Sequence, residues 1–370
     1  MSVVISILIA VVIFGLIITV HEFGHYIAAK KNDVLVLEFA IGMGPILLKK
    51  QGKETLYTLR AFPLGGFCKM LGDMDDDSDK PRALSGKKVW QRLIISASGA
   101  LLNFLLAFIV LVLIVAFTNS RSAEIWRVAE GSPAEAAGLL PDDRIIRANG
   151  FRVNVHEDLM LALNVFSPGE ADLVVMRNGE QQNIVISPRH YPEENVWRIG
   201  VNLHVVNGMF ASPIDGAVRT ASLGETLQIA AGRGLNFANT TIMTVRMLVT
   251  GQLSINDLYS PIGVTALIGE SVSELIDPGE EAASIPFGQR LAFLVNFAAI
   301  LCALISVNVG VFNLLPFPAL DGGRIVFLII EGIRRKPVPV HIEAWVHSIG
   351  MILLLLLAGF VIFSDIFSLM

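Results

Sequence analysis

The chain has 370 residues, of which 53% are hydrophobic and 16% charged, with a mean hydropathy of +0.63 and a formal net charge of −5. Soluble domains carry about 25% charged residues, so this composition excludes a purely soluble enzyme. The net charge excludes a broadly basic nucleic-acid binder. Two cysteines, Cys68 and Cys302, cannot build a disulfide framework. We therefore expect an α-helical polytopic membrane protein.

Four segments are long and apolar enough to cross a bilayer, which takes about 20 residues in a helix. They are Val3–Val20, Leu93–Phe117, about Leu291–Leu315 and about Ala344–Phe363. The first segment has no Lys or Arg before Lys30 and no small-residue cleavage site. We therefore predict a retained helix there, and not a signal peptide.

A fifth apolar stretch, Leu227–Val249, carries Arg233, Asn236, Asn239 and Arg246. Such side chains are costly at the centre of a bilayer. This pattern favours an amphipathic helix at the membrane interface over a fifth span.

The distribution of Lys and Arg predicts the orientation of the chain. The loop Lys30–Arg92 holds 12 of them and the short loop Pro316–Glu343 holds four, whereas Asn119–Arg290 holds 12 in 172 residues. Dense basic loops stay in the cytoplasm. Both termini and the long segment are therefore expected outside the cytoplasm.

Within the long segment, Glu124–Arg189 predicts a small αβ domain. We expect strands at Ile125–Ala129 and Arg144–Ala148, and helices at Pro133–Ala137 and His156–Val165. We also expect a hairpin at Asp172–Ile186 that turns at Asn178-Gly179. The run from Gly131 (GSPAEAAGL), followed by that from Pro141 (PDDRIIRANG), resembles PDZ domains of bacterial membrane and periplasmic proteases. Such domains take a peptide terminus as an added strand. The alternative is a spacer domain that binds nothing.

The motif His21-Glu22-Phe23-Gly24-His25 ends the first apolar segment. Residues four apart share one face of a helix, so His21 and His25 can hold one zinc ion. Glu22 then lies beside the metal as a general base for peptide hydrolysis. The alternative, a pair of interfacial histidines, leaves two imidazoles and an acid at an apolar helix end without compensation.

Catalytic zinc usually has three protein ligands, and Asp321 is the candidate for the third. With four spans, the third segment runs from outside to inside, and Asp321 emerges on the same face as His21 and His25. A fifth span would put Asp321 on the opposite face. The metal hypothesis and the four-span topology therefore depend on each other.

Before Asp321 the sequence places two prolines and two asparagines, Pro316, Pro318, Asn308 and Asn313. The prolines break the helix and free backbone groups with which a substrate strand could pair. The asparagines are candidate hydrogen-bond partners for the substrate backbone. The alternatives are a plain helix end at the prolines and interhelical hydrogen bonds at the asparagines.

Together, His21–His25 and Asn313–Gly323 resemble the two active-site motifs of the site-2 protease family of intramembrane zinc metalloproteases, in its bacterial branch of sigma-E regulator proteases. The likeness includes Gly65–Met70 (GGFCKM), the PDZ-like domain, and Gly251–Ser254 followed by Ser260–Gly263. It implies one zinc ion held by His21, His25 and Asp321, with Glu22 as base. It also implies that Asn308, Asn313, Pro316 and Pro318 engage substrate.

The resemblance further implies the reaction and its place. The enzyme would cut a single-span protein, such as a trimmed anti-sigma factor or a remnant signal peptide, in the bacterial inner membrane near its cytoplasmic side. The loop Leu35–Leu71, with glycines and alternating polarity, resembles the membrane-associated β-hairpin of this family and would offer an edge to the unwound substrate. Its alternative is an ordinary cytoplasmic hairpin. The one PDZ-like domain departs from the tandem pair of the enterobacterial enzyme.

The expected organisation has four parts. They are two helices with the histidine motif and hairpin (1–118), the PDZ-like domain (119–200), a linker with the interfacial helix (201–290) and two helices with the Leu-Asp-Gly motif (291–370). Two other classes of function remain open. A silent PDZ-containing scaffold would not need Glu22 beside two histidines, and a proton-relay transporter would show inverted repeats.

Overall fold

The computed structural model describes residues 2–73, 80–165, 169–192, 196–211, 217–251, 261–276, 285–336 and 338–368. Most of the stretch Gly251–Gly263, which contributes to the family resemblance, therefore lies outside the described residues. The chain forms two compact units. Unit 1 comprises residues 1–107 and 241–370, and unit 2 comprises residues 108–240.

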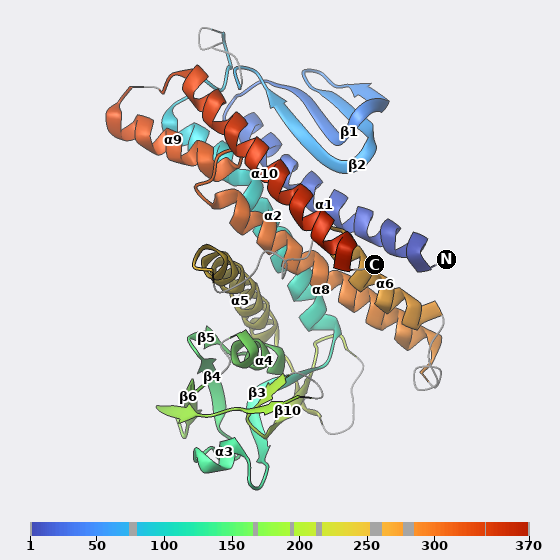
Figure 1. The fold of residues 1–370 in the computed structure, drawn as a ribbon, viewed down its shortest axis with the longest axis vertical. Coiled ribbons are helices and arrows are strands. Elements are labelled where there is room, and N and C mark those ends of the chain that lie inside the picture. Colours follow the sequence, from blue (N-terminus) through green and yellow to red (C-terminus); the bar gives the residue numbers. More distant parts are fainter. Residues whose placement is uncertain are drawn as a thin grey trace. The chain divides into compact units, whose positions relative to one another are not determined.

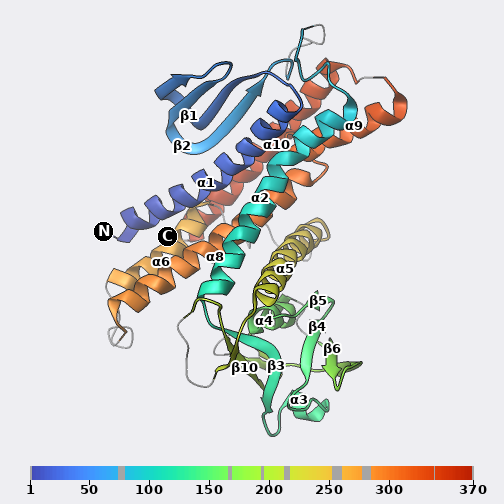
Figure 2. The ribbon, with the colours of Figure 1, turned by 180° about the vertical axis from the view of Figure 1, so that it is seen from behind.

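Four helices among the described residues are long and apolar enough to span a membrane: α1 (Ser2–Lys31), α2 (Val89–Phe117), α8 (Phe287–Leu314) and α10 (Val340–Ser368, with Ile342–Phe363 as the apolar part). They coincide with the four predicted spans. In unit 1 they run side by side in both views (Figures 1 and 2). Their outward side chains are apolar, as Val12 (66% exposed) and Leu353 (53% exposed) show. This is the surface that a lipid solvent requires.

A shorter helix that the sequence did not predict, α6 (Pro261–Ile276), packs into this bundle. Its Ile268 and Val272 are fully buried in one apolar cluster with Ile17 of α1 and Leu301 of α8. With 16 residues, α6 is too short to be recognised as a span from its length.

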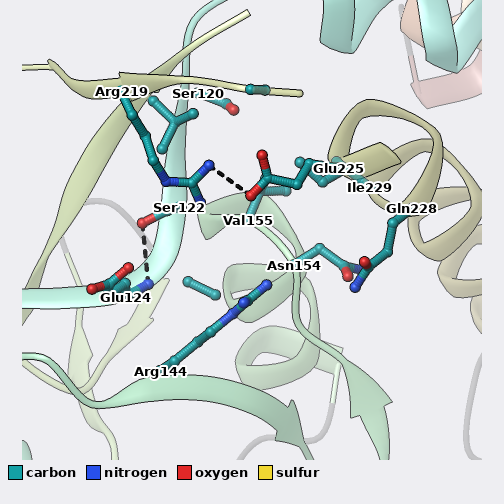
Figure 3. A pocket seen from close by; sticks show the side chains of 13 residues that line it. Ser120, Ser122, Glu124, Arg144, Asn154, Val155, Arg219, Glu225, Gln228 and Ile229 are labelled. Carbon is teal, nitrogen blue, oxygen red and sulfur yellow. Dashed lines mark hydrogen bonds and ion pairs between the residues drawn. The ribbon is translucent and has the colours of Figure 1, made fainter. Parts of the chain in front are cut away.

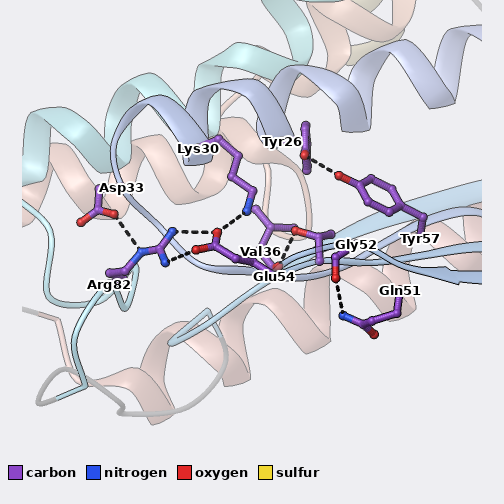
Figure 4. Close-up of polar contacts among 10 residues, drawn as sticks. Tyr26, Lys30, Asp33, Val36, Gln51, Gly52, Glu54, Tyr57 and Arg82 are labelled. Atoms are coloured by element: carbon purple, nitrogen blue, oxygen red, sulfur yellow. Dashed lines mark hydrogen bonds and ion pairs between the residues drawn. The ribbon is translucent and has the colours of Figure 1, made fainter.

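The loop after α1 forms the predicted hairpin, an antiparallel pair of β1 (Val36–Gln51) and β2 (Leu56–Met70). Ion pairs fix its turn to the end of α1 (Figure 4): Glu54 accepts from Lys30 at 2.9 Å and from Arg82 at 2.6 Å. The Arg82 and Lys30 cations lower the pKa of Glu54 to about 2. The Tyr26 and Tyr57 hydroxyls also share a hydrogen bond of 2.7 Å. The hairpin is thereby held along the last turns of the helix that carries the histidine motif.

In unit 2, one sheet of the described residues has the strand order β11-β10-β3-β4-β6-β7, with β5 paired to β4 and a separate pair β8-β9. The strands are β3 (Ser120–Val128), β4 (Arg144–Ala148), β5 (Phe151–Arg152), β6 (Ala171–Arg177), β7 (Glu180–Ile186), β8 (Arg189–Tyr191), β9 (Val196–Arg198), β10 (Val201–Asn207) and β11 (Ala217–Thr220). The helices are α3 (Pro133–Ala136) and α4 (His156–Val165). The predicted strands, helices and the hairpin turning at Asn178-Gly179 are all present. Ile125, Ile145 and Val175 form the buried side of this sheet.

The amphipathic stretch forms α5 (Leu223–Val249), which is not among the span-like helices of the described chain. Two of its polar residues bond to other parts of unit 2. Asn236 Nδ2 donates to the Arg152 carbonyl at 2.8 Å, and Arg233 pairs with Glu157 at 2.7 Å. These side chains therefore have protein partners in place of lipid.

Near the start of α5, unit 2 encloses a cavity of about 40 Å³ (Figure 3). Arg219 and Glu225 form an ion pair of 2.6 Å at its edge, and Ser122 accepts a hydrogen bond from the Glu124 N–H. A cavity of this size holds no more than one or two waters. It is therefore too small for a substrate.

Candidate metal centre

Three side chains from two distant parts of the sequence meet in unit 1. Asp321 Oδ2 lies 3.1 Å from His21 Nε2 and 3.3 Å from His25 Nε2, and the two Nε2 atoms are 3.2 Å apart. Both histidines are buried, each 8% exposed, and the Asp321 side chain is 17% exposed. The structure thus brings together the three residues that the sequence suggested as ligands.

The elements explain this meeting. His21 and His25 are one helical turn apart on α1, and both belong to its buried face. Asp321 is the first residue of α9 (Asp321–Arg334), which follows α8 after a six-residue turn that contains Pro316 and Pro318. A proline cannot continue the hydrogen-bond ladder, so α8 ends and the chain re-enters a helix at Asp321.

The spacing fits a zinc ion. In tetrahedral coordination with bonds of about 2.0–2.1 Å, ligand atoms lie about 3.3 Å apart. The three separations are 3.1, 3.2 and 3.3 Å. Asp321 Oδ2 is buried and accepts no hydrogen bond. Two imidazoles and one carboxylate that converge at this spacing are a normal zinc donor set.

Helix α2 closes the centre from the side. The backbone oxygen of Ile95 lies 2.8 Å from His25 Nδ1. A Cβ on Gly99 would stand 2.6 Å from His25 Nε2 and 2.7 Å from His21 Nε2. Only glycine at this position lets α2 approach both imidazoles. Composition could have suggested this approach, because the run SASGA around Gly99 is rich in small residues, which allow close helix packing in membranes.

Glu22 faces strand β2. It interacts with the backbone N–H of Cys68 and is electrostatically coupled to both histidines and Asp321. A Cβ on Gly66 would lie 3.4 Å from Glu22 Cγ. Burial raises the pKa of the Cys68 thiol to about 12, with Glu22 adding to the effect. The carboxylate of Glu22 is thus positioned by the hairpin beside the three candidate ligands.

The turn before Asp321 is held by α10. Ala319 has a φ of +75°, a conformation that side chains rarely adopt, and its N–H donates to His347 Nδ1 at 2.9 Å. Gly350 packs so closely on Pro318 that no larger residue fits. The sequence assigned no role to His347, and nothing in its neighbourhood along the chain connects it with the turn.

The expected substrate-binding residues are found in different surroundings. Asn308 Oδ1 accepts a hydrogen bond of 2.5 Å from Thr241 Oγ1, which is the interhelical arrangement. Asn313 is half-buried at the end of α8, and Pro316 is exposed. Pro318 is half-buried against α10. Pro316 is therefore the exposed one of the four, and Asn308, Asn313 and Pro318 are all half-buried.

A family model described as peptidase family M50 matches residues 9–357. The chain belongs to peptidase family M50. A protein of Clostridium acetobutylicum that carries the name of a zinc metalloprotease is 32% identical over 361 residues, with 98% of this chain and 97% of the relative covered. The zinc metalloprotease RasP of Shouchella clausii is 28% identical over 439 residues, with 96% and 97% covered.

The M50 protein is therefore a zinc metalloprotease with several membrane-spanning helices. The expected family, enzyme class and cofactor are confirmed. Its substrates are membrane proteins and it works in contact with lipid, as membership of a membrane protease family implies.

Proposed function

We propose that this M50 protease holds its zinc through His21, His25 and Asp321 and uses Glu22 as the base. The mutual spacing of three buried ligand atoms, 3.1–3.3 Å, carries this assignment. Zinc bound there would polarise a peptide carbonyl and make a water acidic enough to attack it near neutral pH.

Glu22 moves the proton in this scheme. One carboxylate oxygen takes a proton from the attacking water and later returns it to the departing amine nitrogen. The contact with the Cys68 N–H keeps the carboxylate oriented and leaves its other oxygen for this task. His21, His25 and Asp321 keep fixed positions, because α2 and the turn before α9 hold them.

The proposed substrates are single-span membrane proteins whose outer domain has already been removed, such as a trimmed anti-sigma factor or a remnant signal peptide. A membrane helix has its carbonyls hydrogen-bonded, so it must unwind before one can be attacked. The hairpin β1–β2 is the proposed edge for the unwound segment, and it lies directly on Glu22 through Gly66 and Cys68. Asn313 and Pro316 would contact the substrate backbone from the opposite side, with Asn308 and Pro318 shaping the turn.

We assign the parts of the chain as expected from the sequence. Residues 1–118 and 291–370 carry the catalytic centre, and residues 119–200 form a PDZ-like domain. Residues 201–290 form a linker, with an interfacial helix, between the PDZ-like domain and the last two spans. The antiparallel sheet of β3, β4, β6 and β7 with α3 and α4 supports a PDZ-like domain. Such a domain accepts a peptide terminus at a sheet edge, or excludes substrates with bulky outer domains.

The proposed location is the bacterial inner membrane, with both termini outside and the catalytic centre near the cytoplasmic side. The segment Lys30–Arg92, which contains the hairpin, holds nine of the ten lysines of the chain. The positive-inside rule places such segments in the cytoplasm.

The deciding experiment is cleavage, in membranes, of a single-span anti-sigma factor trimmed of its outer domain. The wild type is compared with Glu22→Gln and Asp321→Asn, and the zinc content of each is measured. We expect cleavage by the wild type alone, zinc retained in Glu22→Gln and zinc lost in Asp321→Asn. Zinc bound equally by Asp321→Asn would refute the ligand assignment. Absence of zinc in the wild type would favour a silent scaffold.

A further inference from the structure

One face of α2 lies along the two imidazoles. Ile95, Gly99 and Asn103 are four residues apart, so they are stacked on the same side of the helix. Ile95 presents its carbonyl to His25 Nδ1 at 2.8 Å, and Gly99 provides the space between the rings. Asn103 places its side-chain amide 3.3 Å from His21 Nδ1.

The tautomers of the histidines follow from their orientation. Both rings direct Nε2 towards Asp321 Oδ2. A neutral imidazole that offers the lone pair of Nε2 to a metal carries its proton on Nδ1. In His25 this Nδ1–H donates a hydrogen bond to the Ile95 carbonyl oxygen. The Nδ1–H of His21 needs an acceptor of its own.

The Asn103 amide supplies that acceptor. Its Nδ2 stands next to His21 Nδ1, whereas its Oδ1 is buried without any hydrogen-bond partner. Two N–H groups cannot bond to each other, and the two ends of an amide have the same shape. A half-turn of the amide places Oδ1 at His21 Nδ1 and gives both groups a partner.

Asn103 is also rigidly anchored. The residue is 0% exposed, and its backbone oxygen accepts a hydrogen bond of 2.8 Å from Ser306 Oγ on α8. An amide buried in a membrane-spanning helix is costly unless it is hydrogen-bonded. Ser306 fixes this turn of α2 to the helix that leads to Asp321, so one cross-helix contact aligns the environments of all three ligands.

We propose that Asn103 is a positioning residue for zinc, whose Oδ1 accepts the Nδ1–H of His21 and thereby fixes the ring and its zinc-binding tautomer. This inference rests on the proposed ligand set. Groups of this kind around a metal-bound histidine contribute about 10–100-fold to metal affinity. Asn103 does not touch the substrate, and its effect is transmitted through His21.

The test measures zinc affinity of the full-length protein in detergent, by competition with a chromophoric chelator, together with the absorption spectrum of the Co²⁺-loaded protein. Asn103→Leu removes the acceptor at similar volume, Asn103→Asp keeps an acceptor, and Ser96→Ala is the control for a buried serine on the same helix. We expect Asn103→Leu to bind zinc about 10–100-fold more weakly and to show an altered Co²⁺ spectrum. Asn103→Asp and Ser96→Ala should stay within a few-fold of the wild type.

Equal zinc affinity of the wild type and Asn103→Leu would overturn the proposal and leave the ligand set intact. Absence of zinc binding by the wild type would overturn the ligand set itself. If Asn103→Leu does not fold, ¹⁵N NMR of histidine-labelled wild type and Asn103→Asp decides. The proposal requires a downfield shift of the His21 Nδ1 proton with the stronger carboxylate acceptor, and an unchanged resonance refutes it.

Discussion

A Cβ on Gly24 of α1 would overlap the backbone carbonyl of Ser98 on α2. The two helices therefore touch backbone to backbone one residue from His25 and one residue from Gly99. We expect Gly24→Ala to force the helices apart, lowering stability by about 1–3 kcal/mol and abolishing tight zinc binding. The measurements are thermal unfolding and zinc content of the purified variant.

Gly15→Ala is the matched control on the same helix. Its Cβ would meet one backbone atom, the carbonyl oxygen of Pro63, at an ordinary 3.5 Å. This variant should keep the zinc content of the wild type. If both variants lose zinc equally, the close approach at Gly24 is not what holds the centre together.

Asn308 has two candidate roles, to join helices and to bind substrate, and its hydrogen bond with Thr241 allows a test that distinguishes them. If Asn308 only joins helices, Thr241→Val and Asn308→Leu weaken the same contact, and the double variant is no worse than either single one. Their coupling energy should be about 0.6 kcal/mol, the average in membrane proteins. Unfolding measured over the four variants gives this energy. A KM raised by Asn308→Leu and unchanged by Thr241→Val would instead show that Asn308 contacts substrate.

The strained turn before Asp321 predicts that two alanine-to-glycine substitutions change stability in different ways. Ala319 has a φ of +75°, where glycine is free of steric cost. Ala319→Gly should therefore leave stability unchanged or raise it by up to about 1 kcal/mol. Ala299→Gly, in the interior of α8, should lower it by about 1 kcal/mol or more. Equal destabilisation in thermal unfolding would mean that the backbone at Ala319 is not strained.

Unit 2 should lose stability in acid through Asp143. Burial alone would raise the pKa of its carboxyl, but hydrogen bonds from Arg177 and the Leu140 N–H outweigh this and hold the pKa below its ordinary value. A lowered folded-state pKa stabilises the fold above about pH 4 and ceases to do so as the pH falls through that pKa. Asp143 is 1% exposed, so Arg177→Leu should cost about 3 kcal/mol near neutrality.

Hydrogen exchange of the β6 amides in the full chain, from pH 7 to pH 3, measures this effect. The difference between the wild type and Arg177→Leu should shrink below about pH 4, because protonated Asp143 no longer needs a cation. The exposed Arg127 on β3 is the control, and Arg127→Leu should shift exchange little at any pH. A difference that is independent of pH would assign the loss to packing.

The sequence predicted what local periodicity and composition determine. The spacing of His21 and His25 decides that they share a helix face, and apolar length decides the four spans. Asp321 could be added because the number of spans fixes the side of the membrane on which it emerges. The elements of unit 2 follow from alternating polarity and turn residues, and the hairpin was expected from alternating polarity together with the family resemblance.

The remaining parts of the centre depend on tertiary packing. Ile95 contributes a backbone oxygen, which any residue type would offer, and Gly99 acts by the absence of a side chain. His347 lies 28 residues beyond Ala319 and reaches it only because α10 folds back on the turn. The helix α6 was missed because its 16 residues fall short of a bilayer thickness.

The stacking of Ile95, Gly99 and Asn103 has a consequence for assembly. One added residue before Ile95 would rotate α2 by about 100° and turn all three positions away from the imidazoles at once. Zinc at the proposed site would therefore bind one specific rotation of α2 against α1, and by linkage it would stabilise that rotation in return. Without zinc, the backbone contact at Gly24 and the hydrogen bond from Ser306 to Asn103 would still favour this rotation, and the metal would add its binding free energy to it.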